Sequence, residues 1–205
     1  MNSQDNSTLS MIHNAAKSEF LEKGYRSASL RNIVKKAGVT TGAFYGYYNS
    51  KEELFGALVG DVYEYALNKY KAALAEFAAL PPEKQPDHMS KTTRKCMYET
   101  LLYMFDHRDE FHLILECSDG TKYASIIDEL TELEVESTHA YYEVLKGLGR
   151  SVPYIDERLE HILVTGMINA YFEMLIHDMP LDDAKRYLEE LNIFYNAGWM
   201  RLMGQ

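Results

Sequence analysis

The segment with the most distinctive side chains is residues 40–48, TTGAFYGYY, which combines small residues with hydroxyl groups and contains no acidic residue. On a helix, Phe44 and Tyr48 are four residues apart, so both can face inward. The opposite face then carries Thr41, Gly42, Ala43, Tyr45 and Tyr47. Small residues let a backbone approach a surface closely, hydroxyl groups reach phosphates or base edges, and Ala or Thr suits a thymine methyl group. This face therefore has the chemistry of a helix that lies in the major groove of DNA.

The preceding residues predict the elements that would position this face. Ser29 can cap a helix through its hydroxyl group, and an apolar stripe at helical spacing follows: Leu30, Ile33, Val34 and Ala37. Gly38 stands where a left-handed residue ends a helix, and Thr40 can cap the next one. Residues 29–48 thus predict a helix-turn-helix, whose second helix spans 41–48 and presents its N-terminal residues to bases.

A longer helix is predicted from Lys51 to about Ala79. Ser50 and Glu53 form a capping box at its start, and Pro81 and Pro82 stop it. Lys51 opposes the helix dipole in the first turn, so its placement needs another reason. A nearby phosphate would supply that reason, and an ordinary exposed lysine is the alternative.

A further amphipathic helix over residues 8–23 ends at Gly24, and residues 1–7 are expected to be frayed. Residues 8–55 resemble the DNA-binding domain of TetR-type transcriptional regulators. The resemblance rests on the ordered spacing of Phe20, Gly24, Tyr25, Ser29, Leu30, Arg31, Ile33, Ala37, Gly38, Val39, Gly42, Phe44, Tyr45, Tyr48, Lys51 and Leu54. Tyr47 departs from it, since the family often has His there, and Gly46 weakens a short helix.

This resemblance implies a set of DNA contacts. Residues expected to touch bases or the groove are Arg31, Thr41, Gly42, Ala43 and Tyr45. Residues expected to contact mainly the phosphate backbone are Ser29, Thr40, Tyr47 and Lys51. Residues 1–55 carry seven basic and five acidic side chains, a net charge of +2, whereas the remainder carries −12. Local charge governs phosphate contact, because salt screens fields beyond about 10 Å, so the acidic remainder is expected to lie away from DNA.

Residues 56–205 are expected to form a larger all-helical domain, joined through the long helix. After a loop at 81–90, helices are predicted near 90–106, 108–116, 121–147, 154–177 and 181–203. Aromatic and methionine side chains suit a cavity for small apolar ligands, although a packed core is the alternative. Candidate ligand-binding residues are Met97, Leu101, Met104, Phe105, Phe111, Tyr141, Met167, Tyr171 and Met174. Candidate polar partners are His112, Glu116, His139, Asn169 and Glu173.

The last two predicted helices are more apolar than a solvated surface requires. The resemblance implies that these helices pair with those of a second copy in a homodimer. Candidate interface residues are Ile162, Ala170, Leu191, Phe194, Tyr195 and Trp199. The alternative is that these residues belong to the core of one copy.

Composition narrows the remaining classes of function. The chain has no apolar run long enough to span a bilayer and no signal peptide, and its two cysteines give no disulfide framework, so a cytoplasmic location is expected. No spacing typical of a metal site, cofactor or nucleophile–base pair occurs, so we expect no metal, no cofactor and no enzyme activity.

These patterns together favour an all-α, ligand-responsive transcriptional repressor. It would bind a near-palindromic DNA operator as a homodimer and be released by a small molecule. Two alternatives stay open. One is an activator or constitutive DNA-binding protein without a ligand, and the other is an all-helical small-molecule-binding protein.

Overall fold

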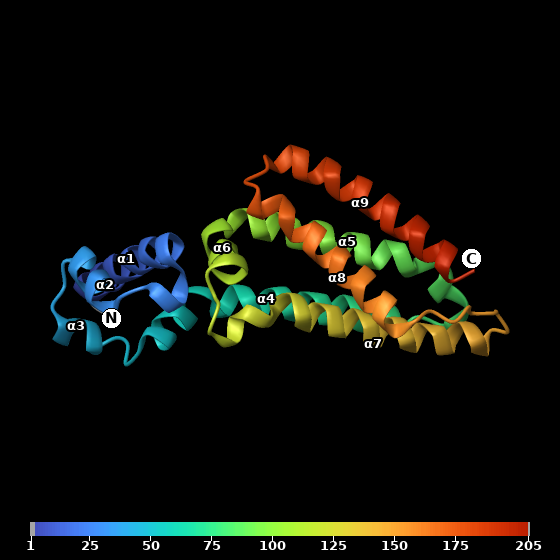
Figure 1. The fold of residues 1–205 in the computed structure, drawn as a ribbon, viewed down its shortest axis with the longest axis horizontal. Helices are drawn as coiled ribbons and strands as arrows, with labels where there is room; N and C mark the ends of the chain where they lie inside the picture. Colours follow the sequence, from blue (N-terminus) through green and yellow to red (C-terminus); the bar gives the residue numbers. More distant parts are fainter. Residues whose placement is uncertain (1–2, 205) are drawn as a thin grey trace. The chain divides into compact units, whose positions relative to one another are not determined.

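The structure is a computed structural model that describes the backbone of residues 3–204 and the side chains of residues 7–88 and 91–204. The helices are α1 Ser3–Ser27, α2 Leu30–Ala37, α3 Thr41–Tyr45, α4 Lys51–Ala78, α5 Gln85–Asp106, α6 Arg108–Glu116, α7 Ile126–Gly147, α8 Glu157–Ile176 and α9 Leu181–Leu202 (Figure 1). Two short 3₁₀ helices, η1 Pro82–Lys84 and η2 Lys122–Ser125, join them. The described residues form no β-strand, and the predicted all-α class is confirmed.

The chain divides into two compact units. The N-terminal unit contains residues up to Tyr65 together with 107–126, and the C-terminal unit contains 66–106 and 127 onward. Helix α4 contributes its first half to one unit and its second half to the other. The sequence places the boundary after residue 55, as a single cut. The structure differs because α6 packs on α1, which brings a distant segment into the N-terminal unit.

An aromatic cluster forms the centre of the N-terminal unit. Phe20 of α1 and Phe55 of α4 meet edge to face, with ring centroids 5.0 Å apart. Tyr25 packs edge to face on Phe55 at 5.3 Å, and Tyr123 of η2 lies on its other side at 6.0 Å. Helices α2 and α3 add Ile33 and Phe44 to the buried set. The two short helices are thus supported by a core that they could not bury alone.

Residues 107–126 are attached to this unit by specific contacts. The N–H group of Tyr25 donates to the carbonyl oxygen of Cys117 at 2.8 Å, and Lys17 of α1 pairs with Glu110 of α6. The hydroxyl group of Tyr123 fits against Gly56 of α4, where an added Cβ would lie 2.9 Å from it. Glycine at this position therefore makes room for a buried ring.

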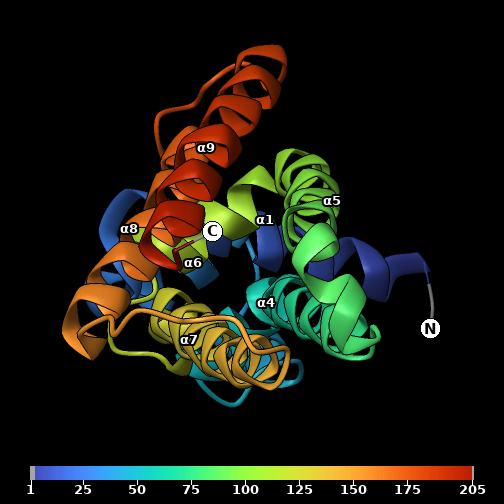
Figure 2. The ribbon, with the colours of Figure 1, turned by 90° about the vertical axis from the view of Figure 1, so that its right-hand side faces the viewer.

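The C-terminal unit packs the rest of α4 with α5, α7, α8 and α9, and Figures 1 and 2 both show α4 beside α7. Tyr171 of α8 donates to the carbonyl oxygen of Met97 on α5 at 3.0 Å. Buried Glu160 of α8 bonds to two residues of α7, His139 at 2.6 Å and Tyr142 at 3.0 Å. Helix α9 packs on α5 and α8. Side chains from five helices thereby surround the interior of this unit.

Several helix ends differ from the predicted ones. Helix α1 begins at Ser3, and α5 begins at Gln85, inside the predicted loop. The Gln85 side chain explains the short connection, because it donates to the carbonyl oxygens of Ala78 and Leu80 and closes the end of α4. Among the described helices, none has the length and apolar character needed to cross a membrane.

Candidate nucleic-acid interface and small-molecule cavity

The turn between α2 and α3 is fixed by local backbone chemistry. Gly38 has φ 66° and ψ 23°, the left-handed conformation in which glycine carries no Cβ penalty. Its N–H group donates to the carbonyl oxygen of Lys35 at 3.2 Å, which ends α2. The Thr40 hydroxyl group then accepts from the N–H of Ala43 at 3.1 Å and caps α3. Both predicted caps at this turn are therefore present.

The two faces of α3 differ as the sequence predicts. Phe44 and Tyr48 are buried, and His13 of α1 bonds to the Tyr48 hydroxyl group at 2.5 Å. The opposite face of Thr41, Gly42 and Ala43 is exposed, and Tyr45 is 53% exposed. Tyr47 is half-buried. The prediction that α3 extends to residue 48 is wrong, because after Tyr45 the N–H of Tyr47 bonds back three residues and tightens the chain into a turn.

A buried carboxylate orients α2 on α1. Glu19 of α1 is fully buried and pairs with Lys36 of α2 at 3.0 Å, and it accepts from Asn32 at 3.1 Å, from Lys23 at 3.2 Å and from the N–H of Ser29 at 3.3 Å. Burial alone would raise the pKa of Glu19, but these bonds outweigh it and lower the pKa to about 2. The predicted cap from the Ser29 hydroxyl group is wrong, since that hydroxyl group makes no capping bond.

The ammonium group of Lys51 binds backbone carbonyl groups of the same unit. Its ammonium group donates to the carbonyl oxygens of Tyr25, Arg26 and Ala28 at 2.6, 3.2 and 3.1 Å. These bonds use all three ammonium N–H groups and place a positive charge where α1 ends, which favours the helix dipole. They also explain why a lysine stands at the start of α4. A nearby phosphate is therefore not needed to explain the position of Lys51.

The cations beside α3 divide into paired and exposed ones. Arg26 pairs with Asp119 at 3.1 Å. Lys36 pairs with two acids of α1, Glu19 at 3.0 Å and Glu22 at 3.3 Å. Arg31 and Lys35 of α2 are exposed, and among the described residues they form no ion pair. These two side chains are consequently the ones available to an anionic partner near α3.

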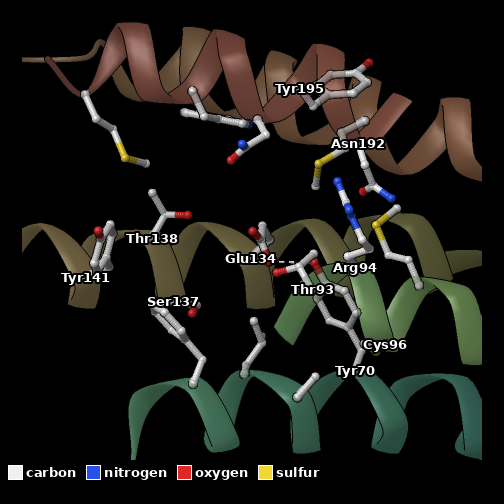
Figure 3. A pocket seen from close by; sticks show the side chains of 18 residues that line it. Tyr70, Thr93, Arg94, Cys96, Glu134, Ser137, Thr138, Tyr141, Asn192 and Tyr195 are labelled. Carbon is white, nitrogen blue, oxygen red and sulfur yellow. Dashed lines mark hydrogen bonds between the residues drawn. The ribbon is translucent and has the colours of Figure 1, made fainter. Parts of the chain in front are cut away.

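A cavity lies within the C-terminal unit, with about 100 Å³ of space accessible to water (Figure 3). Helices α4, α5, α7 and α9 line it, together with Met167 of α8. Its polar wall includes Tyr70, Arg94, Glu134, Tyr141, Asn192 and Tyr195. A single water needs roughly 10–15 Å³ on this measure, so the cavity has room for a small organic group. A smaller, nearly apolar cavity shares Tyr70, Cys96, Met97 and Met167 with it.

Glu134 is the acidic side chain of this cavity. The Tyr70 hydroxyl group donates to its carboxylate at 2.5 Å, as the dashed line in Figure 3 shows. Burial raises the pKa of the Glu134 carboxyl group, and the Tyr70 bond partly offsets this. Burial also raises the pKa of Tyr70, with the Glu134 charge adding to the rise.

Helices α8 and α9 expose large apolar side chains. Ile162 of α8 is 64% exposed, and Phe194 of α9 is 70% exposed. Leu159 and Ile193 are exposed on the same two helices. Single exposed apolar residues are ordinary, but a group of them on adjacent helices is typical of an interaction surface. We call these four residues the α8–α9 apolar surface.

Comparison with known proteins now bears on the N-terminal unit. Residues 12–58 match the family model of bacterial regulatory proteins of the tetR family. A Bacillus subtilis protein called an uncharacterized HTH-type transcriptional regulator, YdgC, is 47% identical over 47 residues, which are 23% of this chain and 24% of YdgC. The similarity to the tetR family therefore covers residues 12–58 of this chain. The first three curated relatives are matched over only 24%, 38% and 57% of their own lengths.

Solved structures extend the similarity to the whole fold. The fatty acid degradation regulator FadR from Bacillus halodurans has a TM-score of 0.56 and 17% identity, over 91% of this chain and 96% of FadR. NalD, a secondary repressor of a multidrug efflux pump in Pseudomonas aeruginosa, has a TM-score of 0.54 and 20% identity, over 93% and 96%. At these identities the likeness concerns the fold.

The structure distributes the candidate ligand-binding residues differently from the prediction. Met97, Tyr141, Met167 and Tyr171 line the two cavities. Leu101, Met104 and Met174 are buried but line neither, so they act as core, and Phe105 is half-buried and lines neither. Phe111 is buried in the N-terminal unit. None of the candidate polar partners lines the cavities: His112 bonds to Glu116, His139 to Glu160, Glu173 to His177, and Asn169 to its own helix.

The candidate interface residues also divide into groups. Ile162 and Phe194 belong to the α8–α9 apolar surface, and Ala170 and Leu191 are half-buried. Tyr195 and Trp199 line the cavity instead. Sequence reasoning missed Tyr70, Arg94, Glu134 and Asn192, although Glu134 and Tyr141 stand seven residues apart on α7, which is a spacing that shares a helix face. Within the described residues, no group of three His, Cys, Asp or Glu side chains could hold a metal ion.

Proposed function

We propose that this chain is a non-enzymatic, ligand-responsive transcriptional repressor. It binds a near-palindromic operator as a homodimer, acts on DNA in the cytoplasm, and is released when a small molecule enters the C-terminal unit. The family of its N-terminal domain supports the regulatory role. Repression, ligand response and dimerisation are the finer parts of the proposal.

The exposed face of α3 carries this proposal. Four residues with small or hydroxyl-bearing side chains face solvent there, and no acid lies among them. The preceding helix, which is in contact with α3, carries the exposed cations Arg31 and Lys35. Close backbone approach, hydroxyl donors and flanking cations together suit a DNA groove with its two phosphate backbones.

Each predicted contact then has a proposed role. Bases or groove edges are met by Arg31, Thr41, Gly42, Ala43 and Tyr45, and phosphates by Ser29, Thr40 and Tyr47. The Thr40 hydroxyl oxygen accepts the cap bond, so its own proton is still available to a phosphate. Lys51 is reassigned, because its bonds to three carbonyl groups make it a positioning residue at the α1–α4 junction.

Dimerisation is supported by the α8–α9 apolar surface. Water-exposed isoleucine and phenylalanine side chains gain free energy when a partner covers them, at about 25 cal/mol per Å² of apolar area. A second copy of the chain carries the same surface, so a two-fold interface would bury both at once. Two copies would also present two α3 helices to two half-sites.

The effector is proposed to occupy the cavity around Glu134. A ligand shifts DNA affinity only by its differential affinity for the bound and released states. A coupling free energy of about 1–3 kcal/mol would weaken operator binding roughly 5- to 150-fold. Tyr70, on the cavity wall, belongs to α4, the helix that begins at Lys51. A displacement of α4 is accordingly our proposed route of release.

Selection of duplexes from a random pool at about 0.15 M salt tests the proposal. The expected result is a two-fold symmetric motif. A Tyr45→Ala variant should bind that motif at least about ten-fold more weakly, and Tyr154→Ala, which removes a tyrosine that is 87% exposed outside this domain, should bind normally. Recovery of no motif, even at lower salt, would contradict the regulatory function. A motif whose affinity no small molecule changes would favour a constitutive binder.

A further inference from the structure

The cavity contains one inward carboxylate, that of half-buried Glu134, whose partners differ from those of the buried acids Glu19 and Glu160. Glu19 is surrounded by two lysines, and Glu160 bonds to His139 and Tyr142. Glu134 accepts from the neutral hydroxyl group of Tyr70 alone among the contacts that the structure gives it. A buried carboxylate is costly unless a cation or several donors compensate its charge. The compensation that the other two acids have is therefore missing at Glu134.

The nearest basic side chain of the cavity wall does not supply this compensation. Arg94 of α5 pairs with Glu189 of α9, with nitrogen and oxygen 3.6 Å apart. Its side chain is about half exposed, so part of its charge faces solvent. Figure 3 shows the two side chains on different helices, Arg94 on α5 and Glu134 on α7. The wall thus has a half-exposed, already paired cation and a half-buried anion that accepts from a neutral hydroxyl group.

Aromatic rings occupy much of the remaining wall. Tyr70 and Phe77 come from α4, Tyr141 from α7, and Tyr195 and Trp199 from α9. Phe77 and Tyr141 meet edge to face at 5.5 Å, so part of this wall is a fixed aromatic corner. The faces of such rings attract organic cations, especially ones with diffuse charge. An anion gains nothing from these faces.

We infer that the cavity binds a small, largely apolar organic cation, such as a quaternary ammonium ion or a protonated tertiary amine, with Glu134 as its counter-ion. The carboxylate compensates the charge, the aromatic rings surround the cationic head, and the apolar part extends toward Met97 and Met167. The inference rests on the proposed effector role of the cavity. It adds the chemical class of the effector, which that role does not specify.

Three probes of similar size test the charge preference. Benzyltrimethylammonium is the cation, neopentylbenzene is its neutral isostere with carbon in place of nitrogen, and phenylacetate is an anion. Binding to the full chain is measured by titration calorimetry and by the fluorescence of Trp199, the single tryptophan of the chain, which lines the cavity. We expect the cation to bind at least about ten-fold more tightly than the other two probes.

A matched pair of variants tests the role of Glu134. Glu134→Gln keeps the side-chain size and should weaken binding of the cation by about ten-fold or more while leaving neopentylbenzene within about two-fold. Glu132→Gln removes an exposed acid from the same helix and should change neither. Circular dichroism and thermal melting check that both variants fold. If Glu134→Gln does not fold, the affinities of the three probes for the unaltered chain still test whether the cavity prefers a cation.

Several results would overturn the inference. They are equal affinity for the cation and its neutral isostere, preference for phenylacetate, binding of no probe, or a loss that is the same in both variants. Preference for phenylacetate would instead indicate Arg94 as the recognising group. Because these measurements contain no DNA, they are independent of the proposed function. A cation that binds through Glu134 but leaves duplex affinity unchanged would refute the effector role and leave the ligand class intact.

Discussion

Glu19 is the buried residue whose removal most directly tests how the helix-turn-helix is held. Glu19→Gln keeps the shape of the side chain but turns two bonds from lysine ammonium groups into bonds to a neutral amide. Each lysine keeps its charge but loses the opposite charge of the carboxylate, and we expect each of the two contacts to lose about 1 kcal/mol. The expected loss in unfolding free energy is therefore about 2 kcal/mol, or roughly 4–8 °C in melting temperature for a chain of this size.

The loss in unfolding free energy caused by Glu19→Gln should depend on pH in a defined direction. The pKa of Glu19 is lowered from 4.5 to about 2 by folding, so its contribution is present above pH 4.5 and disappears as pH falls toward 2. Urea unfolding at pH 7 should separate the wild type from Glu19→Gln, and the difference should shrink between pH 5 and pH 3. Glu22→Gln is the control, since Glu22 is an exposed partner of Lys36. Equal stability of the two variants at pH 7, or a difference independent of pH, would refute the reasoning.

Three further predictions concern other contacts. Lys51→Ala should lower the unfolding free energy by about 2 kcal/mol in urea titrations, because three carbonyl groups lose a charged donor. An unchanged stability would contradict this positioning role and favour a phosphate contact for Lys51. Gly56→Ala should be less stable than Gly60→Ala by about 1–2 kcal/mol, because the added Cβ would lie 2.9 Å from the Tyr123 hydroxyl group at position 56 and 3.4 Å from it at position 60. Equal melting temperatures of the two variants would show that the Tyr123 ring moves freely. Phe194→Asp should shift the chain toward monomer in sedimentation, because it puts a charge on the α8–α9 apolar surface. A sedimentation mass equal to that of the wild type would place any dimer contact elsewhere.

The helix-turn-helix could be predicted from sequence because its determinants are local. Gly38 must be left-handed to end α2, and Thr40 caps α3 from three residues away. The burial of Phe44 and Tyr48 follows from their spacing alone. What could not be predicted depends on distant partners. Glu19 accepts from the N–H group of Ser29, ten residues later, and Lys51 donates to carbonyl groups at the end of another helix.

The cavity was harder to predict for the same reason. A list of Met and aromatic residues contains both wall and core, and only the packing of α4, α5, α7 and α9 separates Met97 from Leu101. Glu134 has the sequence signature of an ordinary exposed helix acid. Its inward direction is set by where α4 places Tyr70, 64 residues earlier in the chain.

The discontinuous N-terminal unit has a consequence for the order of events during translation. Its core includes Tyr123, so α1 to α3 cannot reach their final packing when residue 65 leaves the ribosome. All of residues 66–106 must be made before α6 and η2 can dock, and closing so long a loop slows folding. Until then Phe55 and Gly56 lack the ring that covers them, which exposes apolar surface to chaperones and proteases. A chain cut after residue 65 would keep that incomplete state, so the N-terminal unit reaches its final packing only after residues 107–126 have left the ribosome, while α7, α8 and α9 are still to be made.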